Sequence, residues 1–411
     1  MGARQRLLGV DALRFTAACL VLLTHTSAPW AAWPRWTAPL HWIAADGGTG
    51  VTLFLVLSGF SIHLRWAERG EEGGAFPVVA FWRRRFLRLY PTFWLAVPFC
   101  LTLTVLADGV STVAHAPRGW GWVHGQMPLW TQVLAFALLV PANVIPLVHF
   151  ERAWSLGLEE QLYAVYSAAQ RWRSELLRPR GLLVTAALVA TLFPLAVMLV
   201  LPGWVPFADG ATSREQLLMV QVPALALPWV LGYALAEQRA GRTRLPAMLT
   251  SVPAGLSTLL LLVVVRHVSD PVVHLPAGRI VAPYDVLAQP LFAFGFAAVV
   301  AGAVLDRGGR RIVVPRRVVR PLAWGGLWSY SLYLLHPAVL ELVDRRSHLG
   351  TVPRILAGWA ASLLVAWVFY LLVERRWLRR AQQARIVAPS TPFPRDPHSA
   401  ETQLSGSTGR V

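Results

Sequence analysis

The sequence contains no lysine and only two cysteines, and these scarcities exclude several kinds of chemistry. All 38 basic residues are arginines, so a lysine nucleophile or Schiff base is excluded. Cys19 and Cys100 both lie in apolar runs, which leaves neither a disulfide framework nor a zinc site. The sequence also lacks a phosphate-binding loop, a serine nucleophile elbow and a zinc-binding HExxH helix. We therefore expect no metal and no tightly bound cofactor.

Charged residues are scarce as well, and this scarcity indicates the class of protein. Only 14% of the 411 residues are charged, whereas 55% are hydrophobic. The apolar residues form long runs, so we predict an all-α integral membrane protein that crosses the membrane several times. The net charge of +17 could suggest a nucleic-acid partner, but the arginines occur in short clusters between the apolar runs. Membrane topology explains such clusters better, and we expect no nucleic-acid partner.

Ten hydrophobic runs are long enough to cross a membrane as helices. They cover residues 7–29, 47–65, 86–107, 154–171, 181–201, 217–237, 248–266, 289–305, 324–343 and 354–373. An eleventh run, residues 129–150, is interrupted by Pro141, Asn143 and Pro146.

The distribution of arginine decides whether the eleventh run crosses. If it does not, and the N-terminus is cytoplasmic, 26 arginines lie on the cytoplasmic side and nine on the outer side. Because cytoplasmic loops are enriched in arginine, we predict ten spans with both termini cytoplasmic and residues 129–150 as an interfacial or re-entrant piece outside. Residues 1–385 then form one multi-pass domain in the plasma membrane, in contact with lipid. We expect residues 386–411, rich in proline, serine and threonine, to form a disordered cytoplasmic tail.

The first span holds two ionisable residues, Arg14 and His25, in an otherwise apolar run. Eleven residues return to nearly the same helical face about 16 Å further along the axis, so these side chains share a stripe but cannot touch. Asp11 can pair with Arg14, whereas His25 needs another helix, water or a substrate. A cleaved signal peptide is disfavoured by Asp11 and Arg14 inside the apolar region. A structural polar cluster stays open, but ionisable residues inside a membrane favour a functional site.

The second and third spans carry candidate binding residues. In the second, Gly59 beside Ser58 would allow close approach of a helix or a ligand, and small-residue packing is the simpler interpretation. Arg85 and Arg88 lie three residues apart on one helical face at the cytoplasmic start of the third span. They could anchor anionic headgroups or mark the topology. Alternatively, they could clamp the phosphates of a cytoplasmic acyl donor.

The fourth span places Ser155, Glu159 and Tyr163 on one helical face, at the outer level that His25 should reach. A carboxylate there could orient His25 as a general base, or it could form a structural ion pair with Arg152.

The ninth span places Ser329, Tyr333 and His336 on one face. A lone histidine at such a position is usually a packing residue, but with His25, Arg14 and Glu159 also inside the membrane we predict a shared polar cavity. Glu374 ends the tenth span, and we interpret it as a helix-end ion pair with the arginines that follow it.

In their order along the chain, these motifs resemble the membrane-bound acyltransferase family three. The resemblance runs from about residue 7 to residue 376. It is carried by the spacing of Arg14 and His25 and by the segments FLVLSGF, RRRFLRLYP, WSLGLEEQLY, SYSLYLLH and LLVER. It implies a ten-span enzyme of bacterial type that takes an acyl group, acetyl in the favoured case, from cytoplasmic acyl-CoA. The acceptor it implies is a hydroxyl of a cell-envelope glycan or a glycosylated metabolite.

The resemblance also implies roles for individual residues. His25 matches the family's essential histidine, Arg14 its paired arginine, and Arg85 with Arg88 the pair near the CoA phosphates. Ser58 and Gly59 match the SGF motif, and Glu159 the glutamate of the WSL motif. Arg376 stands where many members have proline, which puts a role for Glu374 in doubt. No extracytoplasmic esterase-like domain follows the membrane part, so a stand-alone enzyme is implied.

The expected mechanism has His25 as general base, oriented by Glu159, with Arg85 and Arg88 holding CoA and Arg14 on the path of the thioester. Tyr163 and His336 are further candidates for binding the substrate or donor. Direct transfer and a covalent acyl-His25 intermediate are both compatible with the sequence. The alternative function is a carrier or exporter that lines its pathway with the same polar residues, without acyl chemistry.

Overall fold

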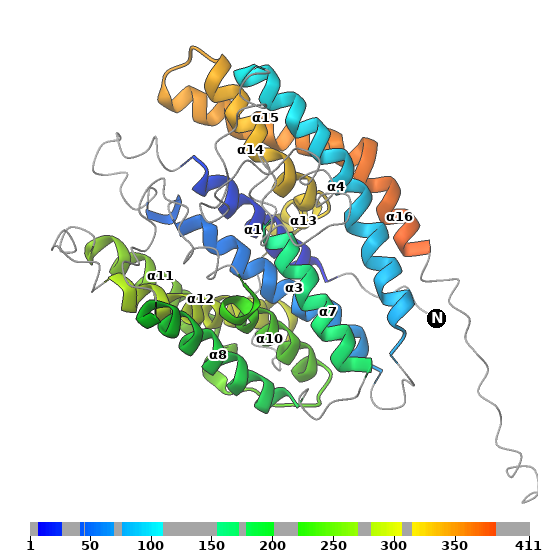
Figure 1. Cartoon of the computed structure of the whole chain (residues 1–411), viewed down its shortest axis with the longest axis vertical. Helices are drawn as coiled ribbons and strands as arrows, with labels where there is room; N and C mark the ends of the chain where they lie inside the picture. Colours follow the sequence, from blue (N-terminus) through cyan, green and yellow to red (C-terminus); the bar gives the residue numbers. More distant parts are fainter. Residues whose placement is uncertain are drawn as a thin grey trace, which may run out of the picture.

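The computed structural model describes residues 7–26, 42–44, 46–69, 76–109, 154–171, 178–200, 221–269, 281–305 and 315–383, and within these ranges it is all-helical, without strands. Two groups of helices lie on either side of a central layer (Figure 1). One group contains α4, α14, α15 and α16, and the other contains α8, α10, α11 and α12. Helices α1 and α3 pack against each other between them, together with α7 and α13.

The elements have the following bounds: α1 Leu8–Thr24, η3 Asp46–Thr49, α3 Gly50–Ala67, α4 Val78–Asp108, α7 Trp154–Arg171, α8 Pro179–Val200, α10 Val222–Arg239, η7 Ala247–Thr250, α11 Val252–Ser269, α12 Val281–Val304, α13 Arg316–Gly325, α14 Ser329–Arg346, α15 Thr351–Phe369, η8 Tyr370–Glu374 and α16 Arg375–Gln383.

Each of the ten predicted segments falls on one of these helices, and within the described ranges five helical stretches are long and apolar enough to cross a membrane. These five are Asp46–Ala67, Val78–Ala107, Pro179–Val197, Leu287–Val304 and Thr351–Gln383. Ten crossings and cytoplasmic termini stay predictions. The interrupted segment 129–150 and the tail 386–411 lie outside the described residues.

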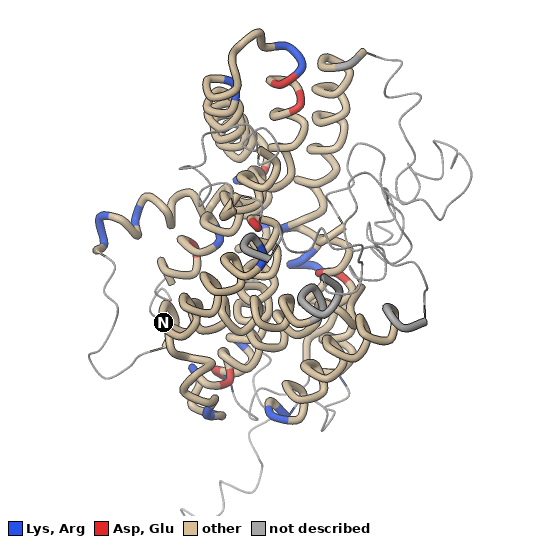
Figure 2. Tube along the Cα trace, turned by 90° about the vertical axis from the view of Figure 1, so that its left-hand side faces the viewer, with Lys and Arg blue, Asp and Glu red and all other residues tan. Residues whose placement is uncertain are grey.

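Most charged positions lie at the ends of helices, and a small group of both signs lies near the centre of the bundle (Figure 2). Helix α4 begins at Val78, well before the predicted start of its span at residue 86. Arg85 therefore lies about 10 Å along the helix from its first residue. The arginine pair thus belongs to the body of α4 and does not precede the helix.

Backbone contact between α3 and α10 fixes the position of α3. A Cβ atom added to Gly59 would lie 2.0 Å from the carbonyl oxygen of Trp229, and one added to Gly232 would lie 2.0 Å from that of Val56. Only residues without a side chain allow two helices to approach this closely. The packing interpretation of Gly59 is thus confirmed.

We expect Gly59→Ala to lower the stability of the protein by about 1–3 kcal/mol, because the added methyl group would push α3 and α10 apart. The measurement is the apparent melting temperature of the detergent-purified protein. Gly181→Ala is the matched control, because a Cβ atom at Gly181 meets nothing within 4 Å. A Gly59→Ala protein as stable as this control would contradict the close backbone contact between α3 and α10.

The predicted topology can be tested by thiol labelling of intact cells, in a background carrying Cys19→Ala and Cys100→Ala. His348→Cys, between α14 and α15, should react with a membrane-impermeant maleimide from outside. Arg244→Cys, after α10, should react only after permeabilisation, because its arginine cluster is predicted to be cytoplasmic. Both positions are exposed in the structure. Labelling of Arg244→Cys in sealed cells would overturn the predicted orientation.

Candidate active site

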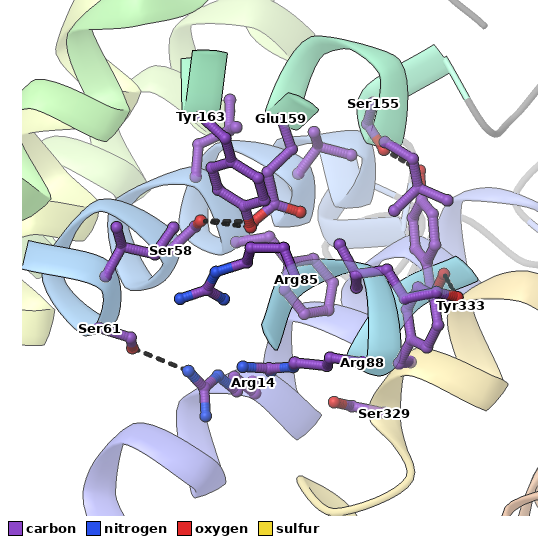
Figure 3. Close-up of a pocket in the computed structure, with 17 residues that line it drawn as sticks. Arg14, Ser58, Ser61, Arg85, Arg88, Ser155, Glu159, Tyr163, Ser329 and Tyr333 are labelled. Carbon is purple, nitrogen blue, oxygen red and sulfur yellow. Dashed lines mark hydrogen bonds between the residues drawn. The ribbon is translucent and has the colours of Figure 1, made fainter. Parts of the chain in front are cut away.

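A cavity of about 100 Å³ lies among α1, α3, α4, α7 and α14, and it contains most of the predicted site residues (Figure 3). The predicted residues that line it are Arg14, Ser58, Arg85, Arg88, Glu159 and Tyr163. Ser155, Ser329 and Tyr333 line it as well, as their helical spacing predicted. Arg14 and Glu159 thus share a polar cavity as predicted, whereas His25 and His336, predicted to share it, are not among its lining residues.

Glu159 accepts hydrogen bonds from two hydroxyl groups on one wall of the cavity. One donor is Ser58 on α3, and the other is Tyr163, one turn further along α7. The two hydroxyl oxygens are 3.3 Å apart, so the three groups form a closed cluster that joins α3 to α7. Arg152, the alternative partner predicted for Glu159, lies outside the described residues.

The predicted contact between Glu159 and His25 is wrong in this structure. Glu159 shares its cavity with Arg14, whereas His25 lies near the far end of α1, about 16 Å from Arg14 along the helix axis. The physical reason is the depth of the carboxylate, which lies more than a turn inside α7 and faces Ser58 on α3 rather than the outer end of α1.

Arg14 is held by two neighbours, as its pairing with Asp11 predicted. Its Nη1 atom donates to Oδ1 of Asp11 at 3.1 Å, and its Nη2 atom donates to Oγ of Ser61 at 2.7 Å. Ser61 was not selected from the sequence as a site residue. It lies three residues after Ser58, so the shared face of the two serines could have identified it.

Arg85 and Arg88 point into the same cavity as Arg14 (Figure 3). The guanidinium carbon of Arg85 lies 5.1 Å from the ring centre of Tyr163 and 5.6 Å from that of Phe81. Its Nε atom is buried without a hydrogen-bond partner. Within the described residues, neither Arg85 nor Arg88 forms a hydrogen bond or an ion pair with another side chain. Two guanidinium groups thus face the cavity without a direct hydrogen bond or ion pair to a described carboxylate, although Glu159 lines the same cavity.

His25 meets His336 of α14 outside the cavity. The Nδ1 atom of His25 lies 2.6 Å from the carbonyl oxygen of Val21 and 3.2 Å from Nε2 of His336. His336 is only 1% exposed and does not line the cavity, so the structure gives no support to its predicted contact with donor or substrate. Tyr333 connects the two places, because it lines the cavity and its ring centre is 6.3 Å from that of His336.

Two other predictions need correction. Gly59 does not line the cavity and packs against α10 instead, because its missing side chain is needed at that helix contact. Glu374 is buried and accepts a hydrogen bond from Ser331 at 2.5 Å, whereas Arg375 and Arg376 are exposed. The predicted helix-end ion pair of Glu374 is therefore absent among the described residues. A π-helical turn at Tyr370–Glu374 turns the carboxylate inward.

A second polar cluster was not anticipated. His63 of α3 contacts Glu237 of α10 at 2.5 Å and the hydroxyl group of Tyr166 of α7 at 3.0 Å. Its ring also stacks on Tyr233, with 3.8 Å between the ring centres. The sequence signal that could have identified this cluster is the presence of a histidine, His63, inside an apolar span. Among the described residues, no cluster of histidine, cysteine, aspartate and glutamate could hold a metal ion.

Comparison with known proteins gives one family and several relatives. The model of a family described as an acyltransferase domain matches residues 7–371. The peptidoglycan O-acetyltransferase OatA of Listeria monocytogenes is 22% identical over 386 residues, which are 90% of this chain and 54% of that protein. The O-acetyltransferase OatA of Staphylococcus aureus is 24% identical over 216 residues, 50% of this chain and 31% of that protein.

A third relative, acyltransferase MdmB of Streptomyces mycarofaciens, is 26% identical over 412 residues, which are 93% of this chain and 94% of the relative. The chain thus spans about a third to about a half of the two O-acetyltransferases and nearly all of MdmB. No solved structure matches the chain significantly.

Tyr163→Phe removes one of the two hydroxyl donors of Glu159, and we expect it to lower the free energy of unfolding by about 1–3 kcal/mol, because the half-buried carboxylate then keeps only Ser58 as a donor. Thermal unfolding in detergent measures the loss. Thr102→Val, at an exposed position on α4 where the hydroxyl group donates to the carbonyl oxygen of Pro98 in the same helix, is the control for removal of a hydroxyl group. Equal stability of the Tyr163→Phe and wild-type proteins would contradict the importance of the cluster.

Proposed function

The chain belongs to the acyltransferase family whose model matches residues 7–371, and from this premise we propose that it moves an acyl group from cytoplasmic acyl-CoA to a hydroxyl group at the outer side of the bacterial plasma membrane. The observation that carries the proposal is the pair of guanidinium groups, of Arg85 and Arg88, that face the cavity without a direct hydrogen bond or ion pair to a described carboxylate.

The arginine pair supports an anionic donor. A charged group inside an apolar bundle is costly unless it finds an opposite charge, and guanidinium groups bind phosphate through paired hydrogen bonds. The phosphates of CoA would supply that charge at Arg85 and Arg88. Arg14 is anchored by Asp11 and Ser61, so it presents a fixed positive charge on the same cavity. This charge would line the path of the thioester toward His25 and add to the positive potential that attracts an anionic donor.

Tyr333 indicates the direction of the acyl arm. It lies between the arginine-lined cavity and the pair formed by His25 and His336. We assign His25 as the general base, which removes the proton of the acceptor hydroxyl while its oxygen attacks the thioester carbonyl. The carbon–sulfur bond then breaks, and the CoA sulfur takes the proton from His25. A covalent acyl-His25 intermediate is the variant in which His25 itself attacks.

Glu159 receives a different role from the one its sequence motif suggested. It holds Ser58 and Tyr163 in place, and Tyr163 lies beneath the guanidinium group of Arg85. We therefore propose that Glu159 shapes and charges the donor side of the cavity. The acceptor is a glycan or a glycosylated metabolite. Peptidoglycan is one candidate, because one relative is named a peptidoglycan O-acetyltransferase.

A carrier without acyl chemistry is not favoured, because the chain is an acyltransferase by family. The test uses radiolabelled acetyl-CoA with membranes that contain the wild type, His25→Ala or Arg85→Ala with Arg88→Ala. The acceptors are peptidoglycan glycan strands and a panel of glycosylated compounds.

We expect label in an acceptor with the wild type, a loss of at least about 10²-fold with His25→Ala, and a raised KM for acetyl-CoA with the double arginine variant. Arg244→Ala, an exposed arginine remote from the cavity, is the matched control. Equal rates in all variants would overturn these roles, and transfer from a donor other than acyl-CoA would overturn the donor.

A further inference from the structure

His25 and His336 form a pair in which each ring contacts the other and also a carbonyl oxygen of its own helix. The ring centres lie 4.8 Å apart at an angle of 63°, so the rings meet edge to face. Each ring also approaches a carbonyl oxygen of its own helix, four residues earlier: Nδ1 of His25 lies 2.6 Å from Val21, and Nδ1 of His336 lies 2.9 Å from Leu332. The same local contact therefore occurs in both helices.

These two carbonyl oxygens determine where the protons are. A carbonyl oxygen can only accept a hydrogen bond, so Nδ1 carries the proton in both rings. A neutral ring protonated at Nδ1 has its lone pair on Nε2. In His336 this lone pair faces Nδ1 of His25 at 3.2 Å, and it can share the proton that His25 also donates to Val21.

The arrangement leaves one nitrogen of the pair free to act as a base. Within the described part of the chain, Nε2 of His25 has no hydrogen-bond partner, and the side chain is half-buried whereas His336 is 1% exposed. We propose that His336 is a positioning residue, which acts with the carbonyl oxygen of Val21 to hold the ring of His25 in the orientation that presents its Nε2 lone pair to the acceptor hydroxyl. This inference rests on the proposed function of His25.

The proposed reaction step shows why a histidine suits this position. When Nε2 of His25 takes the proton of the acceptor hydroxyl, the ring becomes an imidazolium with protons on both nitrogens. Its Nδ1–H group keeps Val21 and His336 as acceptors, and the proton on Nε2 passes to the CoA sulfur as the carbon–sulfur bond breaks. A carboxylate in place of His336 would be an unpaired buried anion before each reaction, whereas neutral imidazole avoids that cost in an apolar bundle.

Other groups near the pair do not serve this purpose. Glu159 is bound to Ser58 and Tyr163 in the cavity. Tyr333, whose ring lies 6.3 Å from that of His336, has its hydroxyl group on Ser155. The indole nitrogen of Trp359 donates to the hydroxyl group of Thr26, next to His25 in the chain, and not to a histidine. His336 is thus the side chain that supplies an acceptor to Nδ1 of His25.

The test compares His336→Leu with His336→Gln in the radiolabelled acetyl-CoA assay. Leucine fills much of the space but has no acceptor, whereas the amide oxygen of glutamine can accept from Nδ1 of His25. We expect His336→Leu to lower kcat by about 10²-fold, because the ring of His25 loses the side-chain acceptor that holds its orientation, with a KM for acetyl-CoA within about twofold of the wild type. His336→Gln should recover kcat to within about tenfold of the wild type.

Controls separate a positioning role from a structural one. His348→Leu, an exposed histidine after α14, should leave kcat and KM unchanged. Apparent melting temperatures show whether the His336 variants fold, and His336→Phe replaces His336→Leu if the latter does not. Two outcomes would overturn the inference while leaving the proposed function intact. One is a wild-type kcat in the folded leucine or phenylalanine variant. The other is a folded glutamine variant whose kcat is as low as that of the leucine or phenylalanine variant. Absence of acyl transfer by the wild type would overturn both.

Discussion

A charged side chain inside an apolar helical bundle must find a partner, and this constraint explains the centre of the molecule. Arg14 meets it within the protein, through Asp11 and Ser61. Arg85 and Arg88 form no direct hydrogen bond or ion pair with a described side chain, although they face the same cavity as Glu159. Under the proposed function, an anionic donor that binds there in each reaction cycle would offset the energetic cost of these two guanidinium groups. In the free protein the positive charges of Arg85 and Arg88 therefore lack a direct partner, and the phosphates of the proposed donor would supply one.

Much of the fold could be predicted from the sequence, because helices in membranes leave long apolar runs. The segment 154–171 coincides with α7, and the faces shared by Ser155, Glu159 and Tyr163 and by Ser329 and Tyr333 are the faces that line the cavity. The depth of each residue was harder to predict. Hydrophobicity alone placed the start of the third span at residue 86, whereas the arginine-rich turns before it are helical as well. Because of that difference, Arg85 lies within the body of α4 and not before its first residue.

Contacts between helices were the part that the sequence could not supply. Helical spacing shows which residues share a face, but it does not show which helix lies opposite. For that reason Glu159 was expected beside His25 and instead contacts Ser58, while the partner of His25 comes from α14. The two places are separate but joined by Tyr333. Such a separation suits a reaction whose donor and acceptor approach from opposite sides of a membrane, since each substrate can be bound without crossing the other's path.

The neighbours Ser58 and Gly59 have different tasks, although they belong to one short motif. The hydroxyl group of Ser58 is part of the cavity wall, whereas Gly59 allows the backbones of α3 and α10 to touch. Replacements at these two positions would therefore affect different properties of the protein. Variation at Ser58 is selected for the substrate that the cavity accepts, and variation at Gly59 is selected for assembly of the bundle. Directed evolution of substrate range in this scaffold should accordingly randomise the first position and keep the second constant.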